Sequence, residues 1–453
     1  MILDPSAALL MRHSGAGPRY TSYPTAPAWL PDFPERTLHE ALERITPPIS
    51  VYVHVPFCIE QCTFCGCNMV VSRRQDAGDR YLDDLARRID RLPLPTDRVP
   101  VARIHLGGGT PTWLTERQLE RLYALLFARF SPIPDAEISV EADPEVTRDE
   151  QVYALRALGV TRLSMGVQSF DPIVLAAVNR PQQHTRVRAL MDLCRAVGMD
   201  SLNLDLMYGL PHQDLASFRD TLDKTLEMRP DRLAIFGYAH VPWLKHHQKR
   251  IDDKALAGPV DRMALFLHAH HRLTADGYQA IGMDHFALAD DDLAVAQREE
   301  RLHRNFMGYT TRSDLALLGL GMSAISEIDG VYAQEHSHLA DWWRAAEGHG
   351  PIIERGCVLD AEDRLRRDVI FGLMCNLCIP KAEIAARHGI DFDAHFAGEL
   401  SRLAPLEDEG LVQLRPDRVQ VTPLGRLLVR LVAMVFDPSL QKPAAGPRFS
   451  QTV

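Results

Sequence analysis

Six apolar, β-branched runs alternate with helix-period segments between residues 49 and 277, and this rhythm restricts the fold more than any other feature of the chain. The runs are ISVYVHVPF, VARIHLGG, AEISVEAD, RLSMGVQSF, SLNLDLMYGL and RLAIFGYAH. The segments after them are DRYLDDLARRIDRL, TERQLERLYALLFARF, TRDEQVYALRALG, HTRVRALMDLCRAVG, LASFRDTLDKTLEM and DRMALFLHAHHRLTADG. Six strand-then-helix units predict an α/β fold with a parallel sheet and helical crossovers. Helices cover both faces of such a sheet, so its strands can be apolar almost throughout.

Six units are fewer than the eight that close a (β/α)8 barrel. Two architectures therefore remain open from the pattern alone, namely a partial (β/α)6 barrel and a doubly wound sheet.

Polar residues follow the predicted strands at the point where each strand ends. In parallel α/β folds the carboxyl ends of the strands share one edge, where active sites form. One polar residue there could be a strand cap, but six in register predict a single mouth. They are Cys58, the segment GGGTP at 107–111, Glu141, Gln168, Asp205, and the segment Tyr238, Ala239 and His240.

Half of the eight cysteines lie in HVPFCIEQCTFCGCNMV, residues 54–70. Structural zinc sites usually pair two CxxC motifs across a longer loop, whereas this spacing is C-x3-C-x2-C-x-C. Three thiolates from one short loop fit a cubane iron–sulfur cluster better, with the fourth iron open to another ligand. The second CxxC, Cys375 to Cys378, lies in an apolar pattern and predicts buried packing.

Charge and composition narrow the possible partners. The formal net charge is −10, which gives no general attraction to nucleic acid or anionic membrane. The N-terminal sequence lacks the pattern of a signal peptide, and the apolar stretch near the end is too short and too interrupted by Arg430 to span a membrane. Clustered cysteines without a secretion signal indicate a reducing, cytoplasmic location.

The order of segments predicts four regions. Residues 1–48, rich in Pro, Gly, Ser and Thr, form an N-terminal arm or lid, and 49–290 form the barrel. Residues 291–360 are expected to be loops and short elements that cover the active site. Residues 361–453 form a mainly helical C-terminal domain, with a hairpin and helix that we interpret as packing or substrate cover.

Cys58, Cys62 and Cys65, with Phe64 before the last, match the CxxxCxΦC signature of the radical S-adenosylmethionine (SAM) enzymes, and GGGTP resembles their glycine-rich SAM motif. Further motifs resemble one family of that superfamily, the oxygen-independent coproporphyrinogen III oxidases. They are GPRYTSYPTA, CGCN, EADP, RLSMGVQSF, NLDLMYGLP, FGYAHVP, IGMDHFA, AVAQREERLHRNFMGYTT and GMSAIS. The resemblance extends from about residue 15 to the last helix.

The resemblance implies a fold, cofactors and an activity. The fold is a partial (β/α)6 radical SAM barrel, and the cofactors are one [4Fe-4S] cluster and two SAM molecules. A 5′-deoxyadenosyl radical would take a hydrogen from a substrate propionate, which then loses CO2 and one electron to leave a vinyl group. Two propionates of coproporphyrinogen III would react in this way, giving protoporphyrinogen IX for haem biosynthesis. The reductant and the electron acceptor are unidentified, and a mouth formed within one chain indicates a monomer.

The resemblance also implies roles for particular residues. Cys58, Cys62 and Cys65 would bind the cluster, while the role of Cys67 stays open, with a place beside the reaction possible. Tyr52, Gly108, Glu141 and Ile325 would contact the first SAM. The second SAM would be contacted by Phe64, Gly109, Thr110, Gln168, Arg180, Asp205 and Ala239.

The substrate's four propionates require cationic or hydrogen-bonding partners. His285, His303, Arg304, Arg19 and Tyr20 are candidates for such partners.

Two alternative functions use the same scaffold. The first is a haem-binding chaperone, against which the CGC motif, the N-terminal arm and HRNFMGYTT argue. The second is a radical SAM enzyme of different outcome, such as a tetrapyrrole-cleaving methyltransferase, whose relatives depart in the N-terminal arm and the C-terminal domain that here resemble the oxidase.

Overall fold

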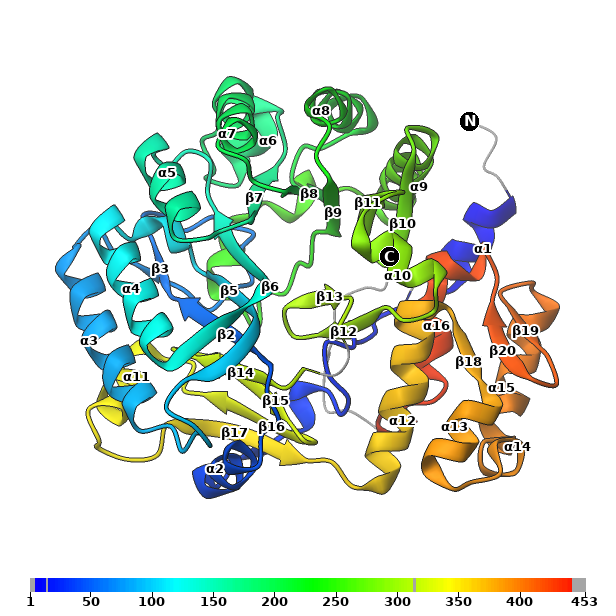
Figure 1. Ribbon diagram of the computed structural model, residues 1–453. Coiled ribbons are helices and arrows are strands. Elements are labelled where there is room, and N and C mark those ends of the chain that lie inside the picture. The colour runs from blue at the N-terminus through cyan, green and yellow to red at the C-terminus, as the bar shows by residue number, and fades with distance from the viewer. Residues whose placement is uncertain (1–4, 14, 313–314, 442–453) are drawn as a thin grey trace.

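The computed structural model describes residues 5–13, 15–312 and 315–441, and it builds them around a thirteen-stranded sheet (Figure 1). Six of its strands run parallel to one another and correspond to the six predicted runs. They are β2 (Ile49–Val55), β5 (Val99–Gly108), β6 (Phe130–Ala142), β7 (Arg162–Gln168), β8 (Ser201–Tyr208) and β9 (Arg232–Gly237).

The order of these strands separates the two architectures. It is β2-β5-β6-β7-β8-β9, so every crossover joins spatial neighbours and the chain always moves in one direction around the sheet. A doubly wound sheet reverses direction at a switch point, which is where its ligand site forms. The parallel part of the sheet is therefore a partial barrel of six units, as the resemblance implied.

Helices lie on the outer side of the parallel strands (Figure 1). Several begin with side chains that cap the helix, such as Thr115, whose hydroxyl accepts from the Gln118 N–H across 3.3 Å while the Gln118 side chain accepts from the Thr115 N–H. The helices are α3 (Asp76–Asp90), α4 (Glu116–Arg129), α5 (Asp149–Ala157), α6 (Pro172–Ala177), α7 (His184–Ala196), α8 (Leu215–Met228) and α9 (Pro259–Ala275).

The sheet continues beyond both ends of the barrel. Next to β2, β14 (Leu317–Leu320) pairs in parallel, with Leu317 opposite Ser50. Further strands then pair antiparallel: β15 (Ile325–Ile328), β16 (Val331–Glu335), β17 (Ile353–Val358) and β1 (Leu30–Pro31). Beyond β9 lie β11 (His285–Leu288) and β10 (Tyr278–Gly282).

Residues 317–358 thus differ from the loops and short elements expected there, because four strands extend the sheet. Each is only four to six residues long, and LLGLGMSAISEIDG contains three glycines, which weaken a strand pattern. The same region contains a separate hairpin, β12 (His303–Asn305) and β13 (Gly308–Thr310), together with α10 (Asp292–Arg298) and α11 (Leu339–Ala346).

The C-terminal region is mainly helical, with a small three-stranded sheet. Cys375 and Cys378 are each 1% exposed, which confirms their expected burial. The elements are α12 (Ala361–Phe371), η5 (Gly372–Asn376), β18 (Cys378–Pro380), α13 (Lys381–His388), α14 (Phe392–His395), α15 (Ala397–Asp408), β19 (Val412–Leu414), β20 (Arg418–Val421), η6 (Gly425–Leu428), α16 (Val429–Met434) and η7 (Pro438–Gln441).

The N-terminal arm lies between the barrel and the C-terminal region. Tyr20 is 1% exposed and donates to the Asp437 carboxylate across 3.1 Å, and Arg430 donates to the Gly17 carbonyl. Trp29 stacks on Tyr332 of β16. The arm contains α1 (Pro5–His13), η1 (Ala26–Ala28) and α2 (Glu35–Glu43). Over the described ranges, no helix combines the length and apolarity that crossing a membrane requires.

Candidate active site

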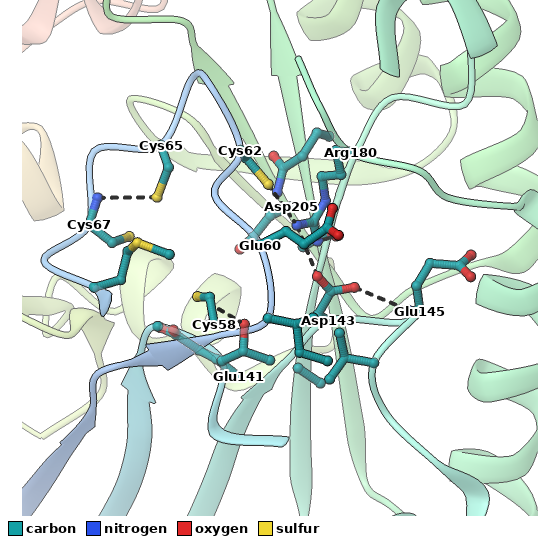
Figure 2. Close-up of a pocket in the computed structure, with 18 of the residues that line it drawn as sticks. Cys58, Glu60, Cys62, Cys65, Cys67, Glu141, Asp143, Glu145, Arg180 and Asp205 are labelled. Atoms are coloured by element: carbon teal, nitrogen blue, oxygen red, sulfur yellow. Dashed lines mark hydrogen bonds and ion pairs between the residues drawn. The ribbon is translucent and has the colours of Figure 1, made fainter. Parts of the chain in front are cut away.

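A cavity of about 410 Å³ opens at the carboxyl ends of the parallel strands (Figure 2). This volume lies in the range of pockets that hold small ligands and cofactors. Twelve of the predicted site residues line it: Cys58, Cys62, Phe64, Cys65, Cys67, Gly108, Gly109, Thr110, Glu141, Gln168, Arg180 and Asp205. The polar residues that follow separate strands in the sequence therefore do meet at one edge.

The four clustered cysteines belong to a loop whose two ends are held together by a short parallel pair. Strand β3 (Phe57–Cys58) pairs with β4 (Val70–Val71), and the Ser72 N–H donates to the Cys58 carbonyl across 2.9 Å. His54 of β2 closes the base further, since its Nε2 lies 2.8 Å from the Asn68 carbonyl oxygen. The loop is thereby tied to the end of the first barrel strand.

Residues far away in the sequence hold the carbonyl groups of the cysteine loop. Gln248, in η3 (His246–Arg250), is 1% exposed, and its side-chain amide donates to the Phe64 carbonyl across 3.0 Å. His247 Nε2 lies 2.7 Å from the Cys65 carbonyl, and the Asn179 amide donates to the Gln61 carbonyl across 3.0 Å. These contacts fix the loop from two sides.

Each of the three predicted cluster ligands has a hydrogen-bond partner at its sulfur. Cys58 Sγ lies 3.4 Å from Thr110 Oγ1, Arg180 Nη1 lies 3.5 Å from Cys62 Sγ, and the backbone N–H of Cys67 lies 3.4 Å from Cys65 Sγ. Outer hydrogen bonds of this kind orient and tune metal-bound thiolates.

The spacing of the sulfurs also bears on the kind of metal centre. Among the described residues, no group of three or more His, Cys, Asp or Glu side chains converges to hold a single metal ion. Figure 2 shows the three cysteines around one open space. Thiolates that bind three different irons of a cubane need not converge on one point.

The thiols differ in acidity because their surroundings differ. Burial raises the pKa of Cys58 to about 12, although the Thr110 hydroxyl acts in the opposite direction. Burial also raises the pKa of Cys62, while Arg180 opposes it. Hydrogen bonding from Cys67 lowers the pKa of Cys65 to about 6.

The glycine-rich turn after β5 packs tightly against the cysteine loop. A Cβ on Gly109 would lie 2.7 Å from the Phe57 carbonyl oxygen and 2.8 Å from the Pro56 carbonyl carbon. Gly108 has φ of +114°, and a Cβ there would lie 2.7 Å from the His54 ring. Only glycine permits this approach without displacement.

Glu141, at the end of β6, faces the same turn. Its carboxylate accepts from the Gly108 N–H across 3.1 Å and lies 3.4 Å from His105 Nε2. Burial alone would raise the pKa of Glu141, but the His105 hydrogen bond and the Gly108 N–H bring it below its ordinary value. Glu141 is therefore an ionised acceptor at the cavity wall.

Asp205, on β8, has a pKa that is raised, whereas that of Glu141 is lowered. Burial, followed by the charge of Glu141, raises its pKa to about 7, although the Asn203 amide donates to it across 2.7 Å. Arg180 is a fixed cation across the cavity, held by the Gly166 carbonyl at 2.5 Å and by Asp143 at 3.1 Å. The cavity lining thus combines a permanent cation with two carboxylates of different acidity.

Three predicted residues do not line this cavity. Tyr52 stacks on His105 with ring centroids 5.9 Å apart, and its hydroxyl lies 3.0 Å from His54 Nδ1. The Ala239 carbonyl accepts from Gln248 across 3.2 Å. Ile325 lies in β15, where it pairs with Gln334.

Sequence reasoning missed several residues that support the site. They are His54, His105, Asp143, Asn203 and Gln248. His105 and Asn203 could have been noticed as polar residues within buried strands, and Asp143 as the second acid of EADP. Gln248 gave no sequence signal, because its partners are backbone carbonyls far along the chain.

A second cavity, of about 200 Å³, continues from the first. Glu141, Ser164 and Asp205 line both. The second cavity extends to Phe236, His285 and the β12–β13 hairpin, where it is lined by Asn305, Met307, Gly308 and Tyr309.

Comparisons with known proteins agree with this geometry. The family model "Radical SAM superfamily" matches residues 52–225, and "HemN C-terminal domain" matches residues 359–428. The oxygen-independent coproporphyrinogen III oxidase of Escherichia coli (strain K12) is 45% identical, covering 100% of this chain and 99% of the relative. This chain belongs to the family of oxygen-independent coproporphyrinogen III oxidases.

Further relatives of the oxygen-independent coproporphyrinogen III oxidase family support the assignment. The Synechocystis protein of that name is 41% identical, covering 99% of this chain and 98% of its own length. The crystal structure described as "Coproporphyrinogen III oxidase (HemN) from Escherichia coli is a Radical SAM enzyme" superposes with a TM-score of 0.90 at 45% identity, covering 93% of this chain and 97% of that one. The chain is an oxidoreductase with the radical SAM fold, and this superfamily uses a [4Fe-4S] cluster and SAM.

Proposed function

We propose that this chain catalyses the oxygen-independent oxidative decarboxylation of two propionate side chains of coproporphyrinogen III to vinyl groups, giving protoporphyrinogen IX. The observation that carries the proposal is the cavity in which the cysteine loop, the GGGTP turn and the ends of β6, β7 and β8 meet. The relatives named above carry the name of the oxidase. No feature of the site favours the alternative of a haem-binding chaperone.

Cys58, Cys62 and Cys65 would hold one [4Fe-4S] cluster, while Cys67 would not be a ligand. In support, the Thr110 hydroxyl, Arg180 and the Cys67 N–H lie beside the three sulfurs. When bound, the cluster and SAM supply a 5′-deoxyadenosyl radical that removes a hydrogen atom from the β-carbon of a propionate. The protein binds and orients the cofactors and the substrate, and it excludes water and oxygen.

Two SAM molecules would lie in and beside the cavity. For the first, the ionised Glu141 accepts from hydroxyl or ammonium groups beside the backbone of Gly108, and Tyr52 and Ile325 would contact the same molecule. For the second, the Arg180 fork suits a carboxylate and Asp205 suits a hydroxyl or ammonium donor. Phe64, Gly109, Thr110, Gln168 and Ala239 complete this second set. For Tyr52, Ala239 and Ile325 the assignment depends on the family resemblance alone.

The substrate would lose CO2 from each propionate and pass one electron per propionate to an acceptor, while a separate reductant would supply electrons to the cluster. We propose that the chain acts as a monomer. All eight cysteines are free, which supports work in the reducing cytoplasm. We also propose four regions. They are an N-terminal arm (1–48), the barrel (49–290), a segment that covers the active site (291–360) and a mainly helical C-terminal domain (361–453).

The test is an anaerobic assay of the full chain with a reconstituted cluster, SAM, a reductant, coproporphyrinogen III and an added electron acceptor. The expected products show two successive losses of CO2 plus two hydrogens by mass spectrometry. Cys62→Ser should lose the cluster absorbance and all turnover, whereas Cys67→Ser, in the same loop, should keep the iron content. SAM cleavage with unchanged tetrapyrrole would contradict the proposed substrate, and loss of iron from Cys67→Ser would contradict the ligand set.

A further inference from the structure

A cluster of charged side chains lies away from the cysteine loop, where the arm, the β12–β13 hairpin, β11 and α16 come together. Its members are Arg19, Arg304, Arg430 and Asp284. Arg19 forms an ion pair with Asp284, and their side chains are 34% and 10% exposed. Arg304 and Arg430 are 3% and 8% exposed, so two guanidinium groups are almost fully buried.

Arg304 is the unusual member, because two of its nitrogens have no hydrogen-bond partner. Its Nε and Nη1 are both buried, and so is the unpartnered Nδ1 of His285. The Arg304 guanidinium lies 4.7 Å from the Tyr309 ring centroid, which offers it only a cation–π contact at these nitrogens. Buried donors without partners are costly, so a group that accepts from them would stabilise the cluster.

The cluster combines three guanidinium groups with the carboxylate of Asp284. Arg19 is paired with Asp284, and nearby Arg232 is paired with Asp291 at 2.6 Å. Burial, and then repulsion from Arg19, lowers the pKa of Arg430 to about 10. Burial alone would raise the pKa of Asp284, but Arg19 and Arg430 hold it below its ordinary value. Arg430 therefore stays charged, and Asp284 stays ionised, at neutral pH.

This cluster adjoins the cavities of the active site. His285, whose ring lies 5.2 Å from that of Tyr309, lines the second cavity together with Tyr309 and Phe236. Arg19 lies 5.4 Å from the Phe236 ring centroid. Since the second cavity shares Glu141, Ser164 and Asp205 with the first, space continues from the cysteine loop to His285 and Tyr309, and the Arg304 guanidinium lies against the Tyr309 ring.

We propose that Arg304 and His285, with Arg19 closing from the arm, bind a propionate carboxylate of the tetrapyrrole other than the one that reacts. The inference deepens the proposed function and depends on it for the identity of the ligand. The carboxylate would accept from Nε and Nη1 of Arg304, whose planar fork matches it, and from Nδ1 of neutral His285. Phe236 and Tyr309 would lie against the apolar part of the macrocycle. Holding one propionate here leaves another to reach the cavity beside Cys62.

The experiment measures binding without turnover. The full chain with reconstituted cluster is titrated anaerobically with coproporphyrin III, the oxidised and unreactive macrocycle, and with its tetramethyl ester, by tryptophan fluorescence. Arg304→Gln should weaken coproporphyrin III binding by about 10- to 100-fold, the usual effect of losing hydrogen bonds to a charged group. The uncharged ester should bind wild type and variant alike. Equal affinity of wild type and Arg304→Gln for coproporphyrin III would overturn the proposal.

Arg366→Gln is the matched control. The Arg366 side chain is 12% exposed, but it is paired with Glu362 and Glu399 in the C-terminal region. Its loss should lower the thermal unfolding midpoint and leave coproporphyrin III affinity unchanged. Arg304→Gln should not lower the midpoint of the ligand-free protein, because it removes a cation without a carboxylate partner. A lowered midpoint with normal coproporphyrin III binding would show that Arg304 is structural and would overturn the proposal.

The two proposals can fail separately. If wild type decarboxylates coproporphyrinogen III but Arg304→Gln binds coproporphyrin III normally, the carboxylate site is wrong and the proposed function stands. If wild type binds coproporphyrin III in an Arg304-dependent manner without decarboxylation, the carboxylate site stands and the proposed reaction is wrong.

Discussion

Arg180 Nη1 lies 3.5 Å from the sulfur of Cys62 and 3.1 Å from the carboxylate of Asp143. This one guanidinium joins the cysteine loop to the segments that follow β6 and β7. Burial alone would lower the pKa of Arg180, but Asp143 and then Cys62 raise it, so the guanidinium stays charged beside the Cys62 sulfur.

Replacing Arg180 with glutamine should weaken retention of the cluster. Loss of such an outer hydrogen bond typically costs about 10- to 100-fold in metal affinity or activity. Iron content and cluster absorbance after a timed chelator challenge measure this effect. The control is Arg186→Gln on the neighbouring helix, where Arg186 pairs with Asp149 at 2.8 Å and lies outside the cavity lining. Equal iron loss from both variants would contradict the prediction.

Asp205→Asn should stabilise the protein at alkaline pH while weakening SAM binding. Because the folded-state pKa of Asp205, about 7, lies above the ordinary value of 3.8, the native state binds more protons between these values. Its contribution to stability is therefore present at low pH and lost as pH rises through about 7, by at most about 4 kcal/mol. Urea unfolding of both proteins from pH 4 to pH 8 tests this. A difference that does not grow with pH would contradict it.

Gly109→Ala should disrupt the site, since its methyl group would lie 2.7 Å from the Phe57 carbonyl oxygen at the base of the cysteine loop. Overpacking of this kind costs about 1–3 kcal/mol and should also reduce SAM binding. Gly66→Ala is the control within the same loop, because no atom lies within 4 Å of the added carbon. Calorimetric titration with SAM should separate the two variants, and an equal loss in Gly66→Ala would exclude this steric explanation.

Gln248→Ala should loosen the cysteine loop without removing any residue from it. The Gln248 side chain bonds to the Phe64 and Ala239 carbonyls and accepts from the Val241 N–H at 2.6 Å, so three backbone groups lose a partner. Amide hydrogen exchange should become faster at residues 61–67. Gln213→Ala is the control, because Gln213 is also buried, at 5% exposed. Its side chain accepts from the Gly209 N–H and donates to the Met207 carbonyl. That control should speed exchange near residues 207–210, and unchanged exchange at 61–67 in Gln248→Ala would refute the prediction.

Much of the barrel could be predicted because each strand and helix carries its own period. The runs around Val53, Ile104 and Leu204 are apolar because both sheet faces are buried, and polar residues such as Glu141 and Asp205 then stand out at the strand ends. That contrast is sufficient to predict one site at the carboxyl ends of the strands, and Glu141 and Asp205 both line the cavity there. The strand order decided between a barrel and a doubly wound sheet, and no local pattern contains that information.

The rest of the site depends on contacts that sequence does not record. β14 has only four residues, three leucines and a glycine, so nothing in it predicts a parallel partner at residues 50–53. The cation cluster of Arg19, Arg304 and Arg430 joins parts of the chain more than a hundred residues apart. Arg19 and Arg304 could be proposed as propionate partners by residue type, but the burial of Arg304 and its two unpartnered nitrogens follow only from the fold.

The pairing of β2 with β14 has a consequence for biosynthesis. Leu317 is opposite Ser50, so 267 residues separate the partners (317 minus 50). As the chain leaves the ribosome, β2, which leads into the cysteine loop, can pair with β5 early. It can pair with β14 only after most of the protein has been made. During that interval one edge of β2 is an unpaired strand edge, open to wrong partners. Iron and sulfide delivered to a nascent chain would thus encounter cysteines that follow a strand paired on one side only. This favours insertion of the cofactor after the chain has left the ribosome.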